Sequence, residues 1–280
     1  MPDPNAAQVE YWNARAAETW VQFQQQLDRQ LQPLGDAALQ ALAPRPGELV
    51  ADIGCGCGHT ALELAAQVGA KGKVVGVDIS RSMLAVARSR SAGLPVEFLE
   101  LDAQTANLAQ AGRVAGFDAV FSRFGVMFFS DPAAAFANIR ASVRRGGRLA
   151  FVCWRPLAQN DWMRVPLEAA LPLLPPLPAS DPLAPGPFAF ADAARVSGLL
   201  RQAGWAEVSH HGVDAHISSG DLDQSLQMTL RVGPLGAALR ENPQFKDRVT
   251  SAVRAALAPH LHDGLVRLPA AVWIFQAHNP

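Results

Sequence analysis

The stretch LVADIGCGCGH, residues 49–59, decides the fold of this chain. Its first residues are mostly apolar, which is typical of a buried strand. Three glycines follow at alternate positions: Gly54, Gly56 and Gly58. They predict a turn, with a helix beginning behind it at Thr60. Because glycine tolerates positive φ and lacks the Cβ that would collide with a ligand, we interpret the turn as a ligand-binding loop.

The glycine spacing argues against a dinucleotide as the ligand. A dinucleotide-binding turn has the pattern G-x-G-x-x-G, whereas this chain has G-x-G-x-G and places His59 where the third dinucleotide glycine is needed. Asp52, two residues before the first glycine, would repel a pyrophosphate but could accept hydrogen bonds from an ammonium group. From these residues alone, a tight strand-to-helix turn without a ligand remains the alternative.

The run DIGCGCGH, residues 52–59, resembles the first motif of class I S-adenosylmethionine-dependent methyltransferases. The resemblance implies that S-adenosylmethionine is the cofactor, that the three glycines surround it, and that Asp52 faces the ammonium of its methionine moiety. It also implies an α/β fold: a doubly wound, Rossmann-like, seven-stranded and mostly parallel sheet with helices on both faces.

A second acid, Asp78, ends the next predicted strand, residues 73–77. In a doubly wound sheet this position places a carboxylate beside an adenosine ribose, where it can accept both hydroxyl protons. An ordinary acid at a strand end is the alternative.

The resemblance assigns four further residues to the adenine. Ile79 and Met83 would lie against the ring, and a polarizable thioether suits such a contact. Asp102 would accept from the adenine amino group, and the amide of Ala103 would reach a ring nitrogen. For Asp102, a solvent-facing turn acid is the alternative.

The strand predicted at residues 117–122 should end at the same edge of the sheet. Strand carboxyl ends border the ligand crevice of an open α/β sheet, so Ser122 and Arg123 are further candidates for cofactor binding. A substrate carboxylate is a second possible partner for Arg123, and a salt bridge or a stem packed on apolar residues is the alternative. The following R-x-G-G-x-L sequence, residues 144–149, resembles small-molecule methyltransferases of ubiquinone and menaquinone biosynthesis.

The 280-residue chain divides into four predicted segments. These are an N-terminal helical lid (1–44), the S-adenosylmethionine-binding α/β core (45–154), a Pro-rich cap insertion (155–189), and the rest of the core (190–280) with a helical insertion at about 220–265. Pro33 and Gly35 are expected to break this first segment into two helices, and helices packed on a core are the alternative to a lid. The apolar run 270–277 is expected to be the last strand, antiparallel by resemblance.

Bulk composition narrows the function further. Lys+Arg 24 against Asp+Glu 25 does not indicate a nucleic-acid-binding surface. We find neither a transmembrane segment nor a signal peptide, so we expect a cytoplasmic protein. Three cysteines, two of them on the turn, do not suggest a disulfide framework, and Cys55-x-Cys57 lacks the further ligands of a metal site. The sequence leaves monomer and homodimer open.

Aromatic and Pro-rich segments around the predicted core suggest a small apolar or aromatic methyl acceptor in an enclosed site. The candidate substrate residues are Trp12, Trp20, Trp154, Arg155, Asn160 and Trp162. For the tryptophans of the insertion, packing against the core is the alternative.

No catalytic residue can be assigned from the sequence. In-line attack on a sulfonium methyl requires alignment and exclusion of water, and only some acceptors need a base. The candidates for a base are His59, His210, His211, His216 and Glu168. A protein that binds S-adenosylmethionine without methylating is the alternative function, and a nicotinamide oxidoreductase is a weaker one.

Overall fold

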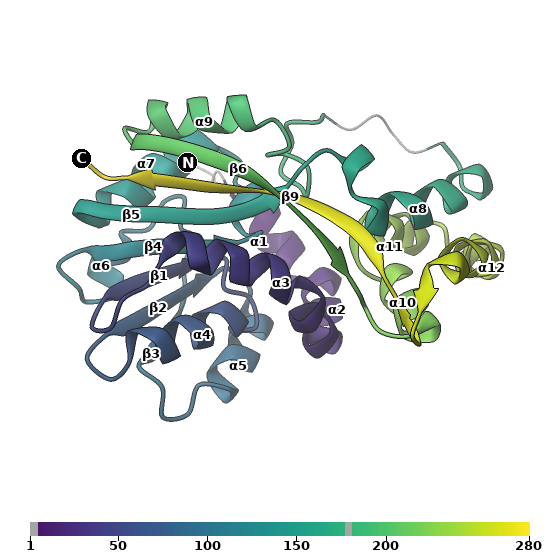
Figure 1. The fold of residues 1–280 in the computed structure, drawn as a ribbon, viewed down its shortest axis with the longest axis horizontal. Coiled ribbons are helices and arrows are strands. Elements are labelled where there is room, and N and C mark those ends of the chain that lie inside the picture. The colour runs from purple at the N-terminus through teal and green to yellow at the C-terminus, as the bar shows by residue number, and fades with distance from the viewer. Residues whose placement is uncertain (1–4, 177–180) are drawn as a thin grey trace.

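A seven-stranded sheet forms the body of the molecule (Figure 1). The structure is a computed structural model that describes residues 5–176 and 181–280. The strands of this sheet are β1 (Leu49–Ile53), β2 (Lys73–Asp78), β3 (Val96–Glu100), β4 (Phe117–Arg123), β5 (Val143–Trp154), β6 (Ala206–Ile217) and β9 (Leu268–His278). Their order is β3-β2-β1-β4-β5-β9-β6. The first five strands pair in parallel, and β9 is antiparallel to both β5 and β6. The predicted fold class is therefore confirmed.

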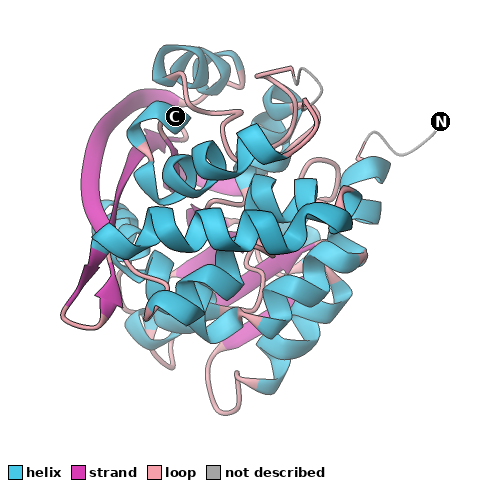
Figure 2. Cartoon of the chain, turned by 90° about the vertical axis from the view of Figure 1, so that its right-hand side faces the viewer, coloured by secondary structure: helices cyan, strands magenta, loops and turns pink. Residues whose placement is uncertain are grey.

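Helices flank this sheet. They are α1 (Ala6–Asn13), α2 (Arg15–Gln22), α3 (Gln24–Leu42), α4 (His59–Val68), α5 (Arg81–Ser89), α6 (Leu108–Ala111), α7 (Pro132–Ala141) and α9 (Ala193–Gln202). Figure 2, turned by 90° from Figure 1, shows that helices cover much of the sheet. None of the helices in the described part of the chain combines the length and the apolar character that a membrane crossing needs.

The central strand β1 positions the glycine turn. It pairs with β2 on one side and β4 on the other, and Val50, Ala51 and Asp52 are fully buried. A strand buried on both faces needs a near-continuous apolar run, which explains its composition. The strand order reverses between β1 and β4, and in such sheets a ligand crevice forms at the carboxyl ends of the strands beside the reversal.

The helical N-terminus is broken at positions that the sequence did not predict. Pro33 and Gly35 both lie inside α3, so the predicted break there is wrong. The breaks fall at Ala14 and Phe23 instead. At Gly35 a Cβ would lie 3.0 Å from Cδ of Arg123, so α3 runs close against the core. Packing of one long apolar face outweighs the hydrogen bond that Pro33 removes.

A cap forms a second compact part of the molecule, on the right of Figure 1. It consists of α8 (Asp161–Ala170), α10 (Leu222–Thr229), α11 (Gly233–Glu241), α12 (Lys246–Leu257) and the hairpin of β7 (Leu261–His262) and β8 (Leu265–Val266). Two segments far apart in the sequence thus share one hydrophobic cluster, which includes Leu226, Leu239, Val249 and Val253. Residues 1–4 of the predicted lid, and Pro178 in the predicted Pro-rich insertion, lie outside the described residues.

Candidate active site

A cavity with an empty volume of about 1020 Å³, counting its open mouth, lies at the carboxyl ends of β1, β2 and β4. Its walls come from the glycine turn, the strand ends and the N-terminal helices. Those helices contribute Asn5, Trp12, Trp20, Gln24, Leu27, Asp28 and Leu31. The turn and strand ends contribute Gly54, Cys55, Gly56, Cys57, Asp78, Ile79, Met83, Asp102, Ala103, Arg123, Phe124 and Gly125, with Phe128 and Phe129 beyond them.

Each of the three positions in the turn requires glycine for a different structural reason. All have positive φ, between 53° and 85°. A Cβ on Gly54 would lie 2.7 Å from Cα of Gly125, and a Cβ on Gly58 would lie 2.9 Å from Cβ of Ala87. At Gly56 the nearest atom would be Sδ of Met83 at 3.8 Å, so its backbone faces open space. Gly54 and Gly56 line the cavity, whereas Gly58 serves helix packing.

Asp78 ties the turn to the end of β2. Its carboxylate accepts hydrogen bonds from the backbone N–H groups of Gly56 and Ser80, both at 2.8 Å. Burial raises the pKa of this carboxyl, and the backbone donors act in the opposite direction. The side chain lines the cavity together with Ile79 and Met83. A carboxylate held in this way is oriented before any ligand arrives.

Asp102 and Ala103 line the same cavity, past the end of β3. Asp102 accepts from the backbone N–H of Gln104 at 2.8 Å and from Nδ2 of Asn5 at 3.3 Å. Asn5 also lines the cavity and was not predicted. Its position before α1 carries no local signal that would connect it to an acid 97 residues away.

Asp52 lies beneath the turn and does not reach the cavity surface. Its Oδ2 accepts a hydrogen bond from Oγ1 of Thr60 at 2.7 Å, and Thr60 itself lines the cavity. Its Oδ1 is buried and has no hydrogen-bond partner among the described residues. Burial raises the pKa of this carboxyl to about 7. A cation bound near this unpaired Oδ1 would stabilise the ionised carboxylate.

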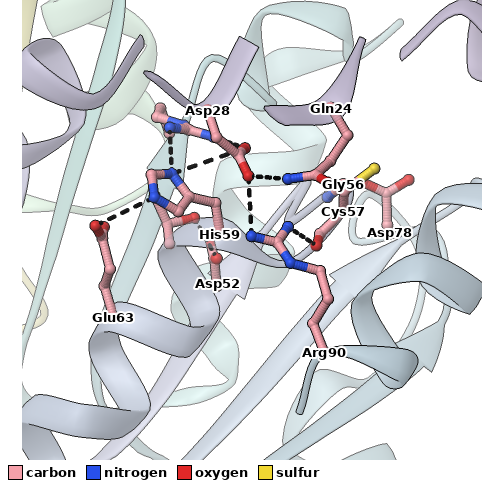
Figure 3. Close-up of polar contacts among 11 residues, drawn as sticks. Gln24, Asp28, Asp52, Gly56, Cys57, His59, Glu63, Asp78 and Arg90 are labelled. Atoms are coloured by element: carbon pink, nitrogen blue, oxygen red, sulfur yellow. Dashed lines mark hydrogen bonds and ion pairs between the residues drawn. The ribbon is translucent and has the colours of Figure 1, made fainter. Parts of the chain in front are cut away.

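An ion-pair network around Asp28 forms part of the cavity wall (Figure 3). Arg90 donates to Asp28 at 3.0 Å, Arg123 approaches it at 3.5 Å, and Gln24 donates to it as well. Nδ1 of His59 lies 3.7 Å from the same carboxylate. The network joins α3 to the turn, to α5 and to the end of β4. Sequence reasoning missed Asp28 because it treated α3 only as an apolar stripe.

His59 belongs to this network and does not line the cavity. It lies 3.0 Å from Nη1 of Arg123 and 3.4 Å from Glu63. Burial and the neighbouring guanidinium of Arg123 lower the pKa of the imidazole, which favours its neutral form. Its ring therefore supports the position of Arg123 in the wall.

Ser122 and Arg123 are adjacent at the end of β4, but their side chains differ in whether they reach the cavity. The hydroxyl of Ser122 is fully buried and donates to the carbonyl of Ile53 at 2.7 Å, so it fastens β4 to β1 and does not line the cavity. Arg123 does line it.

The six candidate substrate residues fall into two groups. Trp12 and Trp20 line the cavity, with their ring centroids 5.9 Å apart. Trp12 also meets Phe128 edge-on at 5.0 Å. The other four lie outside the cavity: Trp154, Arg155, Asn160 and Trp162.

These four residues hold the junction between sheet and cap. Trp154 stacks at 4.2 Å on Phe124, which does line the cavity, and Trp162 packs against Trp154. Arg155 pairs with an acid of β6 at 2.9 Å. Asn160 is fully buried, and its amide bonds backbone groups, including both polar groups of Ala271.

The remaining candidate bases are also remote from the cavity. His210, His211 and His216 are exposed on β6, and Glu168 pairs with Arg164 at 2.8 Å on α8. No histidine stands among the described residues that line the cavity. Within the described ranges, no three His, Cys, Asp or Glu side chains are grouped to hold a metal ion.

Comparisons with known proteins bear on the family. Residues 50–147 match the family described as "Methyltransferase domain". Demethylmenaquinone methyltransferase of Corynebacterium kroppenstedtii is 33% identical over 181 residues, which are 61% of this chain and 74% of that protein. Trans-aconitate 2-methyltransferase of Afipia carboxidovorans is 29% identical over 259 residues, 90% of this chain and 94% of that protein. Other curated relatives are matched over only 33% to 58% of their length.

A solved structure shares the fold over the whole chain. Magnesium protoporphyrin IX methyltransferase from Synechocystis, crystallised with S-adenosylhomocysteine, aligns with a TM-score of 0.57 over 98% of this chain and 99% of that chain. At 16% identity this likeness speaks for the fold alone. Together with the match to most of the Corynebacterium enzyme, it shows that the chain belongs to the class I S-adenosylmethionine-dependent methyltransferases.

Proposed function

We propose that this protein transfers the methyl group of S-adenosylmethionine to a small acceptor with an apolar or aromatic body. One observation carries the proposal: the same cavity is lined by a polar set of residues, made of glycines and acids, and by an aromatic set. The aromatic set consists of Trp12, Trp20, Phe124, Phe128 and Phe129.

The residues of the polar set fit the cofactor. Asp78 would accept from the ribose hydroxyls, while Asp102 and the amide of Ala103 would meet the adenine edge. Ile79 and Met83 would lie against the adenine ring. The open space at Gly56 is what a Cβ would fill, so the turn leaves room for a ligand to approach the backbone.

The amino-acid end of the cofactor would lie toward the charged wall. Asp52 is hydrogen-bonded through its Oδ2 to Thr60, which lines the cavity, and Arg123 and Asp28 offer one charge of each sign at the cavity surface. A zwitterionic amino acid needs charges of both signs nearby.

When bound, the cofactor supplies an activated methyl group on a positively charged sulfur. The contribution of the chain is then to align the acceptor and to exclude water. Trp12 is in edge contact with both Trp20 and Phe128, and all three side chains line the cavity, where they would limit access of water. With no histidine among the described lining residues, the site suits an acceptor that is nucleophilic once it has lost its proton in solution.

A carboxylate acceptor, of the kind named for the Afipia relative, has weaker support in this cavity. Among the described lining residues Arg123 supplies the cationic side chain, and it already contacts Asp28. A multiply charged acid would need further cations to replace its hydration. A neutral aromatic acceptor would need none.

Two measurements test the proposal. In calorimetry the purified chain should bind S-adenosylhomocysteine and should not bind NADH; the reverse result contradicts the assignment of the cofactor. Transfer of a labelled methyl group should then be compared for 1-naphthol and 1-naphthoic acid, which share their rings and differ in charge. Preference for the acid would contradict the neutral acceptor. Binding of the cofactor without transfer to any of a wide acceptor panel would favour a non-methylating protein.

A further inference from the structure

Helix α1 is attached to the rest of the molecule in an unusual way. None of its eight residues is fully buried, and a helix of this length is not stable in water by itself. Helices of globular proteins are usually held by a buried apolar face. Another kind of contact must therefore keep α1 in place.

Asn13, the last residue of α1, makes two hydrogen bonds to the segment that joins β2 to α5. Its Nδ2 donates to the carbonyl of Ile79 at 2.7 Å, and its Oδ1 accepts from the backbone N–H of Arg81 at 3.0 Å. Arg81 is the first residue of α5, and the side chain of the preceding Ser80 makes no capping hydrogen bond. Asn13 therefore supplies a cap to α5 from 68 positions away in the chain.

Asn5, directly before α1, makes a second attachment. Its Nδ2 donates to Oδ1 of Asp102 at 3.3 Å, and its Oδ1 accepts from the hydroxyl of Ser130 at 2.8 Å. The two ends of α1 are thus fastened to the segments that follow β2 and β3.

Both attachments meet the proposed adenine site. Ile79 and Asp102 line the cavity, and they are the residues proposed above to contact the adenine ring and its amino group. Trp12, next to Asn13, also lines the cavity and meets Phe128 edge-on at 5.0 Å. A ligand that orders the segments at Ile79 and Asp102 therefore also favours the attached position of α1.

We propose that α1 is a strap over the cofactor and that Asn13 is the positioning residue that holds this strap closed, in the position seen here. The inference rests on the placement of the adenosine proposed above. Cofactor binding stabilises the closed strap, and by linkage the closed strap raises the affinity for the cofactor. Because exposed hydrogen bonds and not a buried face hold the end at Asn13, the strap can open without unfolding of the core.

The chain contains its own reporter of α1. Tyr11 is the one tyrosine of the sequence, and its ring is 46% exposed, with its centroid 5.1 Å from that of Trp12. The full chain labelled with 3-fluorotyrosine therefore gives a single ¹⁹F signal, which comes from α1. In unliganded Asn13→Ala this signal should move from its wild-type position toward that of the urea-unfolded chain. Saturating S-adenosylhomocysteine should move it back.

Release of S-adenosylhomocysteine gives a second measurement. Loss of the two hydrogen bonds should raise its dissociation rate roughly three- to thirtyfold in Asn13→Ala, measured with labelled ligand displaced by an unlabelled excess. The control is Asn242→Ala, the same substitution at an asparagine of the cap whose Nδ2 donates to the carbonyl of Ala238 at 3.0 Å. This control should change neither the dissociation rate nor the signal of Tyr11.

A normal dissociation rate in Asn13→Ala would overturn the inference. This holds even if the variant unfolds at lower urea concentration, because Asn13 would then have a structural role only. A signal of Tyr11 that keeps its wild-type position would show that α1 does not need Asn13. If Asn13→Ala fails to fold, Asn13→Asp replaces it, since it keeps an acceptor for Arg81 and loses the donor to Ile79. A normal dissociation rate in that variant would contradict the strap equally.

The placement of the adenosine fails or holds separately. It is tested by Asp78→Ala, whose carboxylate is lost without any change to the attachments of α1. If Asp78→Ala weakens S-adenosylhomocysteine and Asn13→Ala does not, the strap alone is wrong. If the wild type binds no S-adenosylhomocysteine, the proposed function is wrong, and the signal of Tyr11 in the unliganded variant still tests the attachment.

Discussion

The core and the cap each enclose a cavity, but they build it in different ways. In the core, glycines with positive φ and acids at strand ends line the cavity together with aromatic side chains. In the cap, the walls of a second cavity come from side chains packed between helices, with no charged residue among the described lining. Charge recognition is thus concentrated at the sheet, while the cap offers shape and apolar surface.

The turn and the cap should therefore also differ in how many amino-acid substitutions they tolerate. A turn that depends on positive φ and close backbone contact has few permitted residues. A cap held by packing accepts many combinations of apolar side chains of the right total volume. Substitutions can test this contrast, beginning with the turn.

The largest effect is expected at Gly54. In Gly54→Ala the new Cβ would lie 2.7 Å from Cα of Gly125, and the residue would keep a φ of 68°. We expect a loss of about 3 to 5 kcal/mol in the free energy of unfolding, from the overlap and the left-handed backbone together. Urea unfolding followed by circular dichroism measures it.

Gly56→Ala is the matched control for this prediction. Its φ of 53° is equally unfavourable for alanine, but its Cβ would meet nothing closer than 3.8 Å. Its loss should be about 1 to 2 kcal/mol. Equal losses in the two variants would show that backbone conformation, and not the contact with Gly125, sets the requirement.

A pH-dependent stability is expected from Asp52. Burial raises the pKa of its carboxyl from 3.8 to about 7 in the folded protein. Between these values the folded state holds a proton that the unfolded state has released, so this group makes stability fall as pH rises from about 4 to about 7. The full effect is on the order of 4 kcal/mol.

Asp52→Asn isolates this contribution, because its amide oxygen can still accept from Thr60. Without cofactor, the difference in unfolding free energy between variant and wild type should grow with pH across that window and then level off. The comparison is needed because the pKa of His59, which burial lowers, also makes the stability of the protein depend on pH. If the difference in unfolding free energy between Asp52→Asn and wild type stayed constant from pH 4 to pH 8, the raised pKa of Asp52 would be contradicted.

Replacement of Asp78 should lower the affinity of the protein for S-adenosylhomocysteine. Asp78→Ala removes charge-assisted hydrogen bonds to the ribose and should weaken S-adenosylhomocysteine by roughly 2 to 4 kcal/mol in calorimetry. Glu100→Ala, at the end of neighbouring β3 but outside the cavity, should leave the affinity unchanged. If Asp78→Ala binds normally, the adenosine is held elsewhere.

The sequence predicted the core site better than the rest for a physical reason. Gly54 and Gly56 have the positive φ that their own turn requires, and Asp78 and Asp102 follow strands whose ends must meet at one edge. Such constraints act within a few residues, so they leave a local pattern. The seven-stranded sheet and its antiparallel last strand followed from the resemblance.

What the sequence did not predict depends on contacts between distant segments. Asp28 acquires its role only because α3 crosses the turn, and its partner Arg90 is 62 residues away. Pro33 stays inside a helix because packing of α3 outweighs a local preference. Asn160 looked like a pocket residue but is bound to the backbone of Ala271, 111 residues away. No local pattern records such pairings.

The smallest effect is expected on the surface of the cap. Asp223 and Arg254 form an ion pair there, and their side chains are 70% and 47% exposed. Because exposed pairs gain little over hydration, Arg254→Ala should change the free energy of unfolding by less than about 1 kcal/mol. Val253→Ala, at a fully buried neighbour on the same helix, should cost about 2 kcal/mol. Urea unfolding compares the two. If the surface variant proved the more damaging, charge rather than apolar packing would hold the cap together, and the contrast with the core would fail.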